Sequence, residues 1–315
     1  MITAENLRKR YGARTAVDGI SFELRPGLVT GFLGPNGSGK STTMRMAVGL
    51  DTPTSGSITI GGRPFAQHPA PLRSVGAVLD AGATHPGRTG RQHLRALAAT
   101  HRISSRRVDA MIELTGLGEV AGKRIRGYSL GMNQRLGIAA ALLGDPAVLI
   151  FDEPVNGLDP EGVRWVRRLA RQMAAEGRTV FVSSHLMSEM SHTADHLIVL
   201  GRGRIIADAP ISELLNSGDE RVLVRTEQAA ALTSALSGPD VAVEQVDAET
   251  LHITGASPML IGRRALEAGV ALHELTPQRS SLEDQYMKLT GEHVEYSSGD
   301  PSPGDPDQQS RESAP

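Results

Sequence analysis

Short apolar runs, each closed by glycine or a polar turn, alternate along most of the chain with segments of helical periodicity. Apolar runs of this length predict strands, which fall at residues 21–24, 28–33, 57–60, 74–79, 147–151, 179–183, 197–200 and 204–207. Between residues 89 and 115, apolar side chains instead recur at helical spacing, first around Leu94 and then around Val108. This alternation of strands and helices predicts an α/β fold.

Residues around Asp159 carry the signals of a helix start. Asp159 suits the N-cap, Pro160 suits the first turn, and Glu161 suits the positive end of the helix dipole. An apolar face follows, and Gly177 is suited to ending the helix. A second, Ala- and Leu-rich helix is predicted over residues 136–143.

The character of the chain changes near residue 217, and we predict domains over residues 1–216 and 217–292. In the second, short strands are expected at 221–225, 241–246 and 251–254, with helices at 229–236 and 260–268. This pattern indicates a small α+β appendage, either structural support, a regulatory domain or a dimer clamp. Residues 293–315 are rich in Ser, Pro, Gly, Asp and Gln, so we expect a disordered tail.

Composition removes several classes of function. The 315 residues contain no cysteine, which excludes disulfides, thiolate metal sites and cysteine nucleophiles. The 33 Lys and Arg residues against 35 Asp and Glu residues give a net charge of −2, so no basic excess recruits nucleic acid, and we expect no nucleic acid partner. The apolar runs are far shorter than the roughly 20 residues that span a bilayer, so we expect the chain not to cross a membrane.

A glycine-rich segment after the run 28–33 fits the phosphate-binding pattern G-x-x-x-x-G-K-[ST] at every fixed position. Its glycines allow backbone N–H groups to surround phosphate oxygens, Lys40 can reach the β- and γ-phosphates, and the Ser41 hydroxyl can hold Mg²⁺. The predicted nucleotide-binding residues of this loop are Gly34, Pro35, Asn36, Gly37, Ser38, Gly39, Lys40, Ser41 and Thr42.

A second apolar run, at residues 147–151, ends in two carboxylates. Asp152 has the Walker B position and would hold Mg²⁺, directly or through water. Glu153 can polarise a water in line with the γ-phosphate. Alone, this pattern also describes a buried strand followed by a helix-capping acidic pair. With the phosphate loop it predicts Mg²⁺-nucleotide chemistry, although the motif does not say which nucleotide.

Three further segments then separate the classes of phosphate-loop protein. They are Tyr-Ser-Leu-Gly-Met-Asn-Gln-Arg at 128–135, Asn-Gly-Leu-Asp-Pro at 156–160 and Ser-Ser-His at 183–185. With the phosphate loop and the Walker B carboxylate, these segments follow one another in the order found in the ATP-binding subunits of ABC transporters. The chain resembles that family across roughly residues 1–215. The resemblance implies a RecA-like core, an antiparallel β subdomain and a helical subdomain, with ATP and Mg²⁺ as cofactors.

The resemblance also implies roles for single residues. Tyr11, placed before the first predicted strand, would stack on adenine. Ser129 and Gly131 would contact the γ-phosphate bound to the opposite subunit, and Asp159 would link the two sites across the dimer. His185 would contact the γ-phosphate. The implied catalytic residues are therefore Glu153, His185 and Lys40.

Two positions depart from the family pattern. Asp80 stands where a glutamine is usual after the run 74–79, and it can accept a hydrogen bond from a metal-bound water. The implied metal-binding set is therefore Ser41, Asp152 and Asp80. Met132 replaces the usual glutamine of the signature and cannot make its hydrogen bonds.

Between Asp80 and Ser129 the chain is rich in arginine, which indicates either a solvated helix face or contact with a membrane partner or lipid headgroups. His85, His93 and His101 are too widely spaced for a compact metal site.

Within the family, Asp80, the segment 85–90 and the signature at 128–135 resemble the exporter branch. The implied protein is an ATPase that pairs with a separate ABC-2 type permease at the cytoplasmic face of the cell membrane. It would export a drug, antibiotic or lipid-like compound. One phosphate loop and one signature imply a second ATPase subunit, most simply a homodimer. The alternatives are a soluble ABC ATPase of translation or DNA repair, and a regulatory module that binds nucleotide without hydrolysis.

Overall fold

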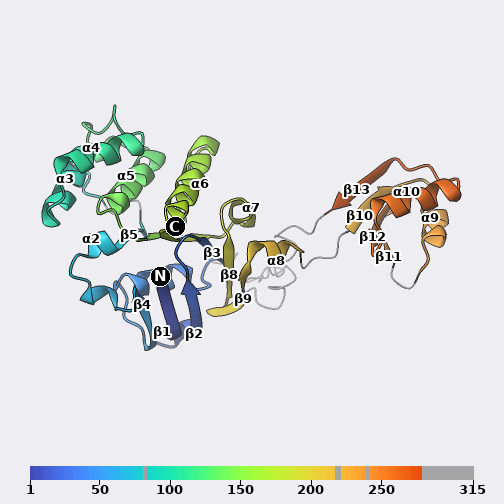
Figure 1. Cartoon of the computed structure of the whole chain (residues 1–315), viewed down its shortest axis with the longest axis horizontal. Helices are drawn as coiled ribbons and strands as arrows, with labels where there is room; N and C mark the ends of the chain where they lie inside the picture. Colours follow the sequence, from blue (N-terminus) through green and yellow to red (C-terminus); the bar gives the residue numbers. More distant parts are fainter. Residues whose placement is uncertain (81, 83, 217–220, 239–240, 279–315) are drawn as a thin grey trace, which may run out of the picture.

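The computed structural model describes residues 1–80, 82, 84–216, 221–238 and 241–278. A central mixed sheet lies between a group of helices and a second, antiparallel sheet, and a small C-terminal unit follows (Figure 1). The α/β class and the three parts implied by the resemblance are confirmed. The predicted disordered tail at 293–315 lies outside the described residues.

The central sheet has the strand order β5-β6-β7-β3-β8-β9 and is parallel except for β9. Its strands are β5 (Val75–Val78), β6 (Val148–Phe151), β7 (Thr179–Ser184), β3 (Val29–Leu33), β8 (His196–Gly201) and β9 (Arg204–Pro210). Every residue of β3, β6 and β7 is buried, as expected for parallel strands covered on both faces. Because these strands run in one direction, the residues that follow them meet at one edge of the sheet.

The second sheet has the order β2-β1-β4, formed by β1 (Ile2–Tyr11), β2 (Arg14–Leu24) and β4 (Ser55–Ile60). It packs on the central sheet through a cluster that includes the mutually tilted rings of Phe22, Phe32 and Phe181. The prediction that Tyr11 precedes the first strand is wrong, because Tyr11 is the last residue of β1. Register shifts between Ala4 and Leu7 break the alternation of buried and exposed positions that would have revealed this strand.

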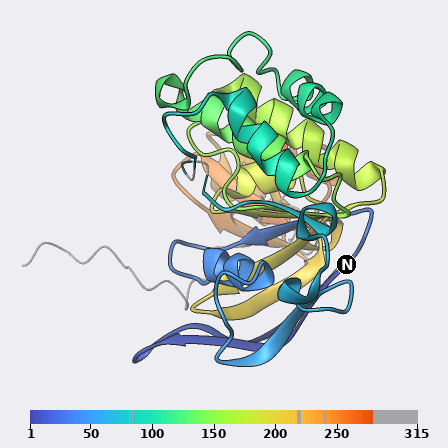
Figure 2. The same ribbon diagram turned by 90° about the vertical axis from the view of Figure 1, so that its left-hand side faces the viewer.

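Helices α3 (Gly90–Thr100), α4 (Ser105–Leu114) and α5 (Leu130–Leu142) form the helical group. Figure 2 shows this green group on one side of the central sheet and the blue strands of the second sheet on the other. Helix α5 begins at Leu130, earlier than the predicted residue 136, because the Ser129 side chain caps its first turn. One of the arginines between Asp80 and Ser129 holds two of these helices together, because Arg91 of α3 pairs with Asp109 of α4.

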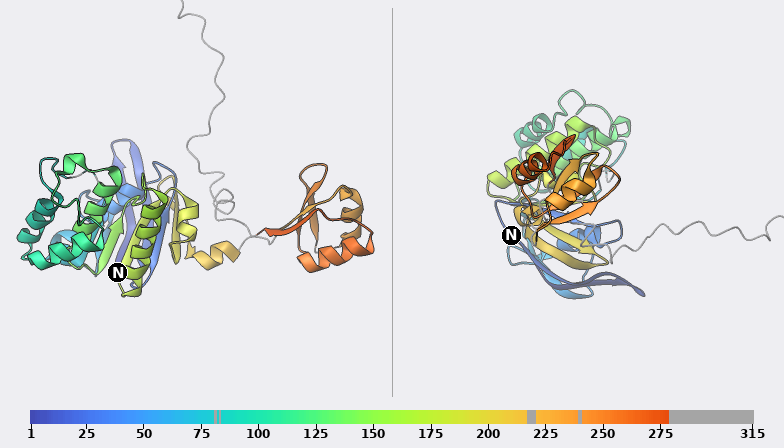
Figure 3. Two further views of the ribbon diagram at one scale, coloured as in Figure 1. Left: turned by 90° about the horizontal axis from the view of Figure 1, so that it is seen from above. Right: turned by 90° about the vertical axis from the view of Figure 1, so that its right-hand side faces the viewer.

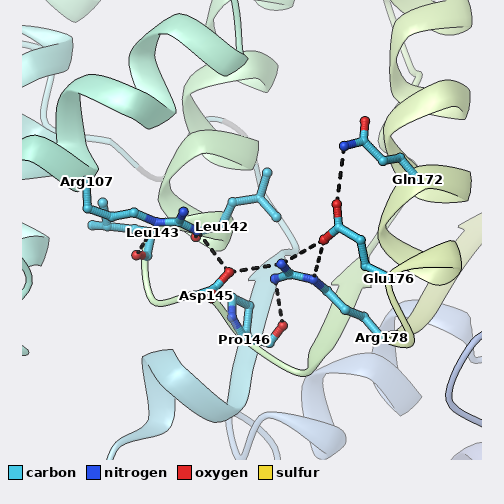
Figure 4. Close-up of polar contacts among 8 residues, drawn as sticks. All are labelled: Arg107, Leu142, Leu143, Asp145, Pro146, Gln172, Glu176 and Arg178. Carbon is cyan, nitrogen blue, oxygen red and sulfur yellow. Dashed lines mark hydrogen bonds and ion pairs between the residues drawn. The ribbon is translucent and has the colours of Figure 1, made fainter.

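The connector between α5 and β6 is held by arginines from two sides (Figure 4). From α4, Arg107 donates to the carbonyl oxygen of Leu142 at 2.9 Å and to Asp145 at 3.1 Å. Arg178, which directly precedes β7, donates to Asp145 at 2.9 Å and to the Pro146 carbonyl at 3.1 Å. One carboxylate therefore joins the helical group to the central sheet at the base of α5.

Helix α6 (Pro160–Ala175) packs on the central sheet, and the Asp159 side chain caps it by accepting from the N–H of Gly162 at 2.7 Å, as the sequence predicts. Helix α1 (Lys40–Ala47) follows β3. Short helices η1 (Phe65–Gln67), α2 (Pro71–Ser74), η2 (Ile125–Gly127), α7 (Met187–Ser191) and α8 (Ile211–Asn216) complete this part. In the described segments, no helix combines the length and apolarity needed to cross a bilayer.

The C-terminal unit runs β10 (Arg221–Arg225), α9 (Ala229–Ala235), β11 (Ala242–Gln245), β12 (Thr250–Thr254), α10 (Pro258–Glu267) and β13 (Glu274–Gln278). Its antiparallel sheet has the order β11-β12-β10-β13, which is the ferredoxin-like β-α-β-β-α-β arrangement (Figure 3). The unit has its own hydrophobic cluster, which includes Val224, Leu251 and Ile261. Strand β13 has no counterpart among the predicted elements, and the boundary at residue 216 stays a prediction.

Candidate functional site

The phosphate loop joins the end of β3 to the start of α1, and its glycines are required by close approach and by backbone conformation. Gly39 has φ +104° and caps α1, and a Cβ atom on it would lie 2.5 Å from the carbonyl oxygen of Ala16. A Cβ on Gly34 would lie 2.7 Å from the carbonyl oxygen of Leu200. Side chains at these positions would push the loop off its neighbours, so only glycine keeps its N–H groups turned toward one centre.

Lys40 is 6% exposed, and its ammonium group reaches back over the loop. It donates to the carbonyl oxygen of Gly34 at 2.6 Å and lies 3.6 Å from Oε1 of Glu153. Burial lowers the pKa of Lys40 below its usual value, while the Glu153 and Asp152 carboxylates act in the opposite direction. A bound phosphate would supply further negative charge and favour the ammonium form.

A cavity of about 400 Å³ opens in front of the loop. It brings together predicted residues from three parts of the sequence, because Tyr11 and Glu153 line it with the phosphate loop. The lining consists of Tyr11, Arg14, Ala16, Pro35, Asn36, Gly37, Ser38, Gly39, Lys40, Ser41, Thr42 and Glu153. Within the described part of the chain, Ser38 Oγ and Glu153 Oε1 are buried without a hydrogen-bond partner, as expected for groups that await a ligand.

Asp152 and Glu153 follow β6, and a serine of β7 holds both of them. Ser183 donates from Oγ to Oδ1 of Asp152 at 2.5 Å and accepts the backbone N–H of Glu153 at 2.9 Å. The sequence placed Ser183 in a motif but gave it no role. Its position directly across from the acidic pair depends on the parallel pairing of β6 with β7, which the local pattern does not reveal.

His185, Glu153 and Lys40 form a continuous polar chain. Nδ1 of His185 lies 2.9 Å from Oε2 of Glu153, whose other oxygen faces Lys40. Glu153 has φ +48°, a left-handed conformation that is uncommon for glutamate. Strained residues of this kind persist where the surrounding structure fixes them, often at functional sites. The structure thus brings the three predicted catalytic residues together.

Tyr11, to which the resemblance assigns adenine stacking, lines the cavity and is 47% exposed. Its hydroxyl donates to Asp51 at 3.0 Å, and Arg45 binds the same carboxylate oxygen at 2.8 Å. The Lys9 ammonium lies 4.9 Å from the ring centroid. Burial and the Asp51 carboxylate raise the pKa of Tyr11 above its usual value, so the phenol stays neutral at physiological pH.

Ser129, Gly131 and Asp159 lie outside this cavity, at the starts of α5 and α6. Ser129 Oγ accepts the N–H of Met132 at 3.2 Å. The two loops meet each other instead, because a Cβ on Gly131 would contact the side chain of Leu158 at 3.2 Å. The structure therefore groups the signature with the Asp159 loop, apart from the phosphate loop of the same chain.

All three predicted positions offer the oxygen ligands that Mg²⁺ prefers. Ser41 lines the cavity, whereas Asp152 follows β6, which β7 separates from β3, and lies outside the cavity lining. Asp80 is exposed, lies outside the cavity lining and accepts the N–H of Gly82 at 2.7 Å. The described residues contain no group of three His, Asp or Glu that could hold a metal. The hydroxyl of Ser41 and the carboxylate of Asp152 are chemically suited to a Mg²⁺ ion whose other ligands would be phosphate oxygens and water.

Comparison with known proteins gives a consistent result over most of the chain. The family model described as "ABC transporter" matches residues 17–156, and a model described as a domain of unknown function matches residues 220–283. The chain is 33% identical over 298 residues to the ABC transporter ATP-binding protein YhcH of Bacillus subtilis, which covers 94% of this chain and 97% of that protein.

Two further relatives have names that state what they transport. The bacitracin transport ATP-binding protein BcrA of Bacillus licheniformis is 34% identical over 304 residues, covering 92% of this chain and 97% of that protein. The Nod factor export ATP-binding protein I of Cupriavidus metallidurans is 33% identical over 303 residues, covering 93% and 98%.

Solved structures resemble the part of the chain that carries the site. An ATP-binding subunit of an ABC transporter matches with a TM-score of 0.63 and 25% identity, covering 69% of this chain and 92% of that chain. The protein cbiO1 from Clostridium perfringens matches with a TM-score of 0.60 and 29% identity, covering 68% and 90%.

Proposed function

This chain belongs to the ABC transporter family as an ATP-binding subunit that hydrolyses ATP, and we propose that it powers export through a separate ABC-2 type permease. The proposed cargo is an antibiotic, drug or lipid-like compound. Two relatives of the chain support this proposal, because their names state bacitracin transport and Nod factor export. The similarity covers more than nine-tenths of each relative. Through the permease, the subunit would be held at the cytoplasmic face of the cell membrane.

The observation that carries the proposed chemistry is the series of side-chain contacts from Lys40 to Glu153 and from Glu153 to His185. The phosphate loop holds the nucleotide phosphates, and Glu153 accepts a proton from the attacking water. The water oxygen bonds to the γ-phosphorus as the bond to the β–γ bridging oxygen breaks, which releases ADP and phosphate. Lys40 and His185 stabilise the negative charge that develops on the phosphoryl oxygens.

A second copy would complete each site. Ser129 and Gly131 lie outside the cavity of their own chain, so we propose that they close on the γ-phosphate bound to the partner. The helix α5 behind them offers a positive N-terminus to that phosphate. ATP would then hold two copies head to tail, with Asp159 beside the junction, and hydrolysis would separate them.

Mg²⁺ would be held by Ser41 and Asp152, where it would neutralise charge on the β- and γ-phosphate oxygens. Asp80 stays a proposal for the metal-sensing position. Its Oδ1 accepts the N–H of Gly82, and its remaining acceptor sites would receive a hydrogen bond from a metal-bound water.

The test of the transport proposal is affinity capture of the intact protein from its own detergent-solubilised membranes, with an untagged strain as control. We expect a polytopic membrane protein without an ATPase domain, in about equal amount. Capture of ribosomes or nucleic acid in place of a permease would contradict the proposal and favour a soluble ABC ATPase.

A further inference from the structure

Arg14 occupies a place in the nucleotide cavity that no motif explains. Strands β1 and β2 form a hairpin in which Tyr11 pairs directly with Arg14. The tight turn between them uses Gly12 with φ +58°. Side chains directly opposite each other in a hairpin project from the same face of the sheet. Both side chains accordingly line the cavity in front of the phosphate loop.

The guanidinium group of Arg14 reaches the phosphate loop itself. A Cβ atom built on Gly37 would lie 3.3 Å from Nη2 of Arg14. Gly37 is in the middle of the loop and has φ +83°. Arg14 therefore approaches the loop from the hairpin side, in the cavity that Glu153 also lines.

Arg14 is exposed, whereas Arg8 and Arg204 are each paired with a carboxylate. On the same hairpin, Arg8 lies 3.0 Å from Asp18, and Arg204 lies 2.7 Å from the other oxygen of that carboxylate. In the part of the chain that the structure describes, no hydrogen bond or ion pair joins the Arg14 side chain to another residue. Its planar set of N–H donors is available to a ligand.

Charge in the cavity points to the ligand group that Arg14 would bind. The charged residues of the lining are Arg14, Lys40 and Glu153. Lys40 already donates to the Gly34 carbonyl and faces Glu153, so Arg14 is the cation with open donors. An arginine fork matches the geometry of phosphate oxygens and binds them by charge-assisted hydrogen bonds.

We propose that Arg14 binds the β-phosphate of ATP and of ADP, as a nucleotide-binding residue in addition to the phosphate loop. This inference rests on the proposed nucleotide site and extends it. The contact is formed with both nucleotides, so it favours substrate and transition state about equally. Its loss should therefore raise the Kd and the KM for ATP while leaving kcat nearly unchanged.

The experiment measures ATP, ADP and AMP binding to the full chain by titration calorimetry, together with steady-state ATPase kinetics. For Arg14→Gln we expect the Kd for ATP and ADP to rise about tenfold, equivalent to about 1.4 kcal/mol, with AMP unaffected. Arg14→Lys should recover part of the loss, because a point charge remains without the fork. Thermal unfolding without nucleotide should not change, since Arg14 is exposed.

Arg10→Gln is the matched control, since Arg10 lies on the same hairpin, opposite Thr15, and is exposed outside the cavity lining. It should bind all three nucleotides like the wild type. Wild-type affinity in Arg14→Gln would overturn the proposal, and so would an equal loss for AMP or a lowered Tm without nucleotide. Failure of the wild type itself to bind ATP would instead contradict the proposed site.

Discussion

Ser183→Ala should separate nucleotide binding from hydrolysis. The Ser183 hydroxyl is the single group that joins the Asp152 carboxylate to the backbone N–H of Glu153. It is fully buried, and alanine adds no atom that would clash. The substitution therefore removes two hydrogen bonds and leaves the phosphate loop intact.

The two bonds set the size of the effect. A hydrogen bond to a charged group contributes about 1.5–3 kcal/mol, and an N–H left without a partner costs about 1–3 kcal/mol when buried. Asp152 and Glu153 are half-buried, and water can replace part of the loss, so we expect a destabilisation of about 2–3 kcal/mol. Release of Glu153 from its fixed position should lower kcat about 10- to 100-fold.

The assays are thermal unfolding and steady-state ATP hydrolysis, with ATP affinity measured separately. We expect the Kd for ATP to change less than about threefold, because the cavity lining excludes Ser183. Ser191→Ala serves as the control, since its exposed hydroxyl bonds only within α7. A kcat within about twofold of the wild type for Ser183→Ala would refute the positioning role.

The other predictions concern the loop, the ring and the connector. Gly39→Ala should abolish measurable ATP binding, because its Cβ would collide with the Ala16 carbonyl at a strained backbone conformation; calorimetry checks this. Tyr11→Leu should raise the Kd for ATP about tenfold, because base stacking on an aromatic ring contributes about 1–3 kcal/mol, while Tyr11→Phe should keep most of the affinity. Arg178→Ala should lower the free energy of unfolding by about 2 kcal/mol, measured by denaturant titration. Asp145→Asn should lower it by less than about 1 kcal/mol, because the Asp145 carboxylate is 64% exposed.

Helices and strands whose signals lie within their own segment of sequence were predicted correctly. The helix after Asp159 is where its cap and proline place it, and the parallel strands are where the apolar runs lie. The phosphate loop was predicted because its residues match a contiguous motif, although the contacts that require glycine at positions 34 and 39 come from Leu200 and Ala16, in other segments. Strand β1 was not predicted, because its register shifts hide the alternation on which strand prediction depends.

Contacts between distant segments could not be predicted in the same way. Ser183 acts on Asp152 through strand pairing, and Arg14 reaches the loop only because a hairpin folds over it. The resemblance supplied Asp80 with a role from its position in the sequence. Its hydrogen bond to Gly82 shows only where the carboxylate rests, so that role stays a prediction.

The central claim is that Glu153 drives hydrolysis in a dimer held together by ATP. The most direct test compares Glu153→Gln with the wild type for ATP turnover and for mass in solution with ATP and Mg²⁺. We predict retained ATP binding, turnover reduced about 10²- to 10⁴-fold, as expected for loss of a general base, and a stable dimer that forms only with ATP. Unchanged turnover, or a variant that stays monomeric with saturating ATP, would contradict the account.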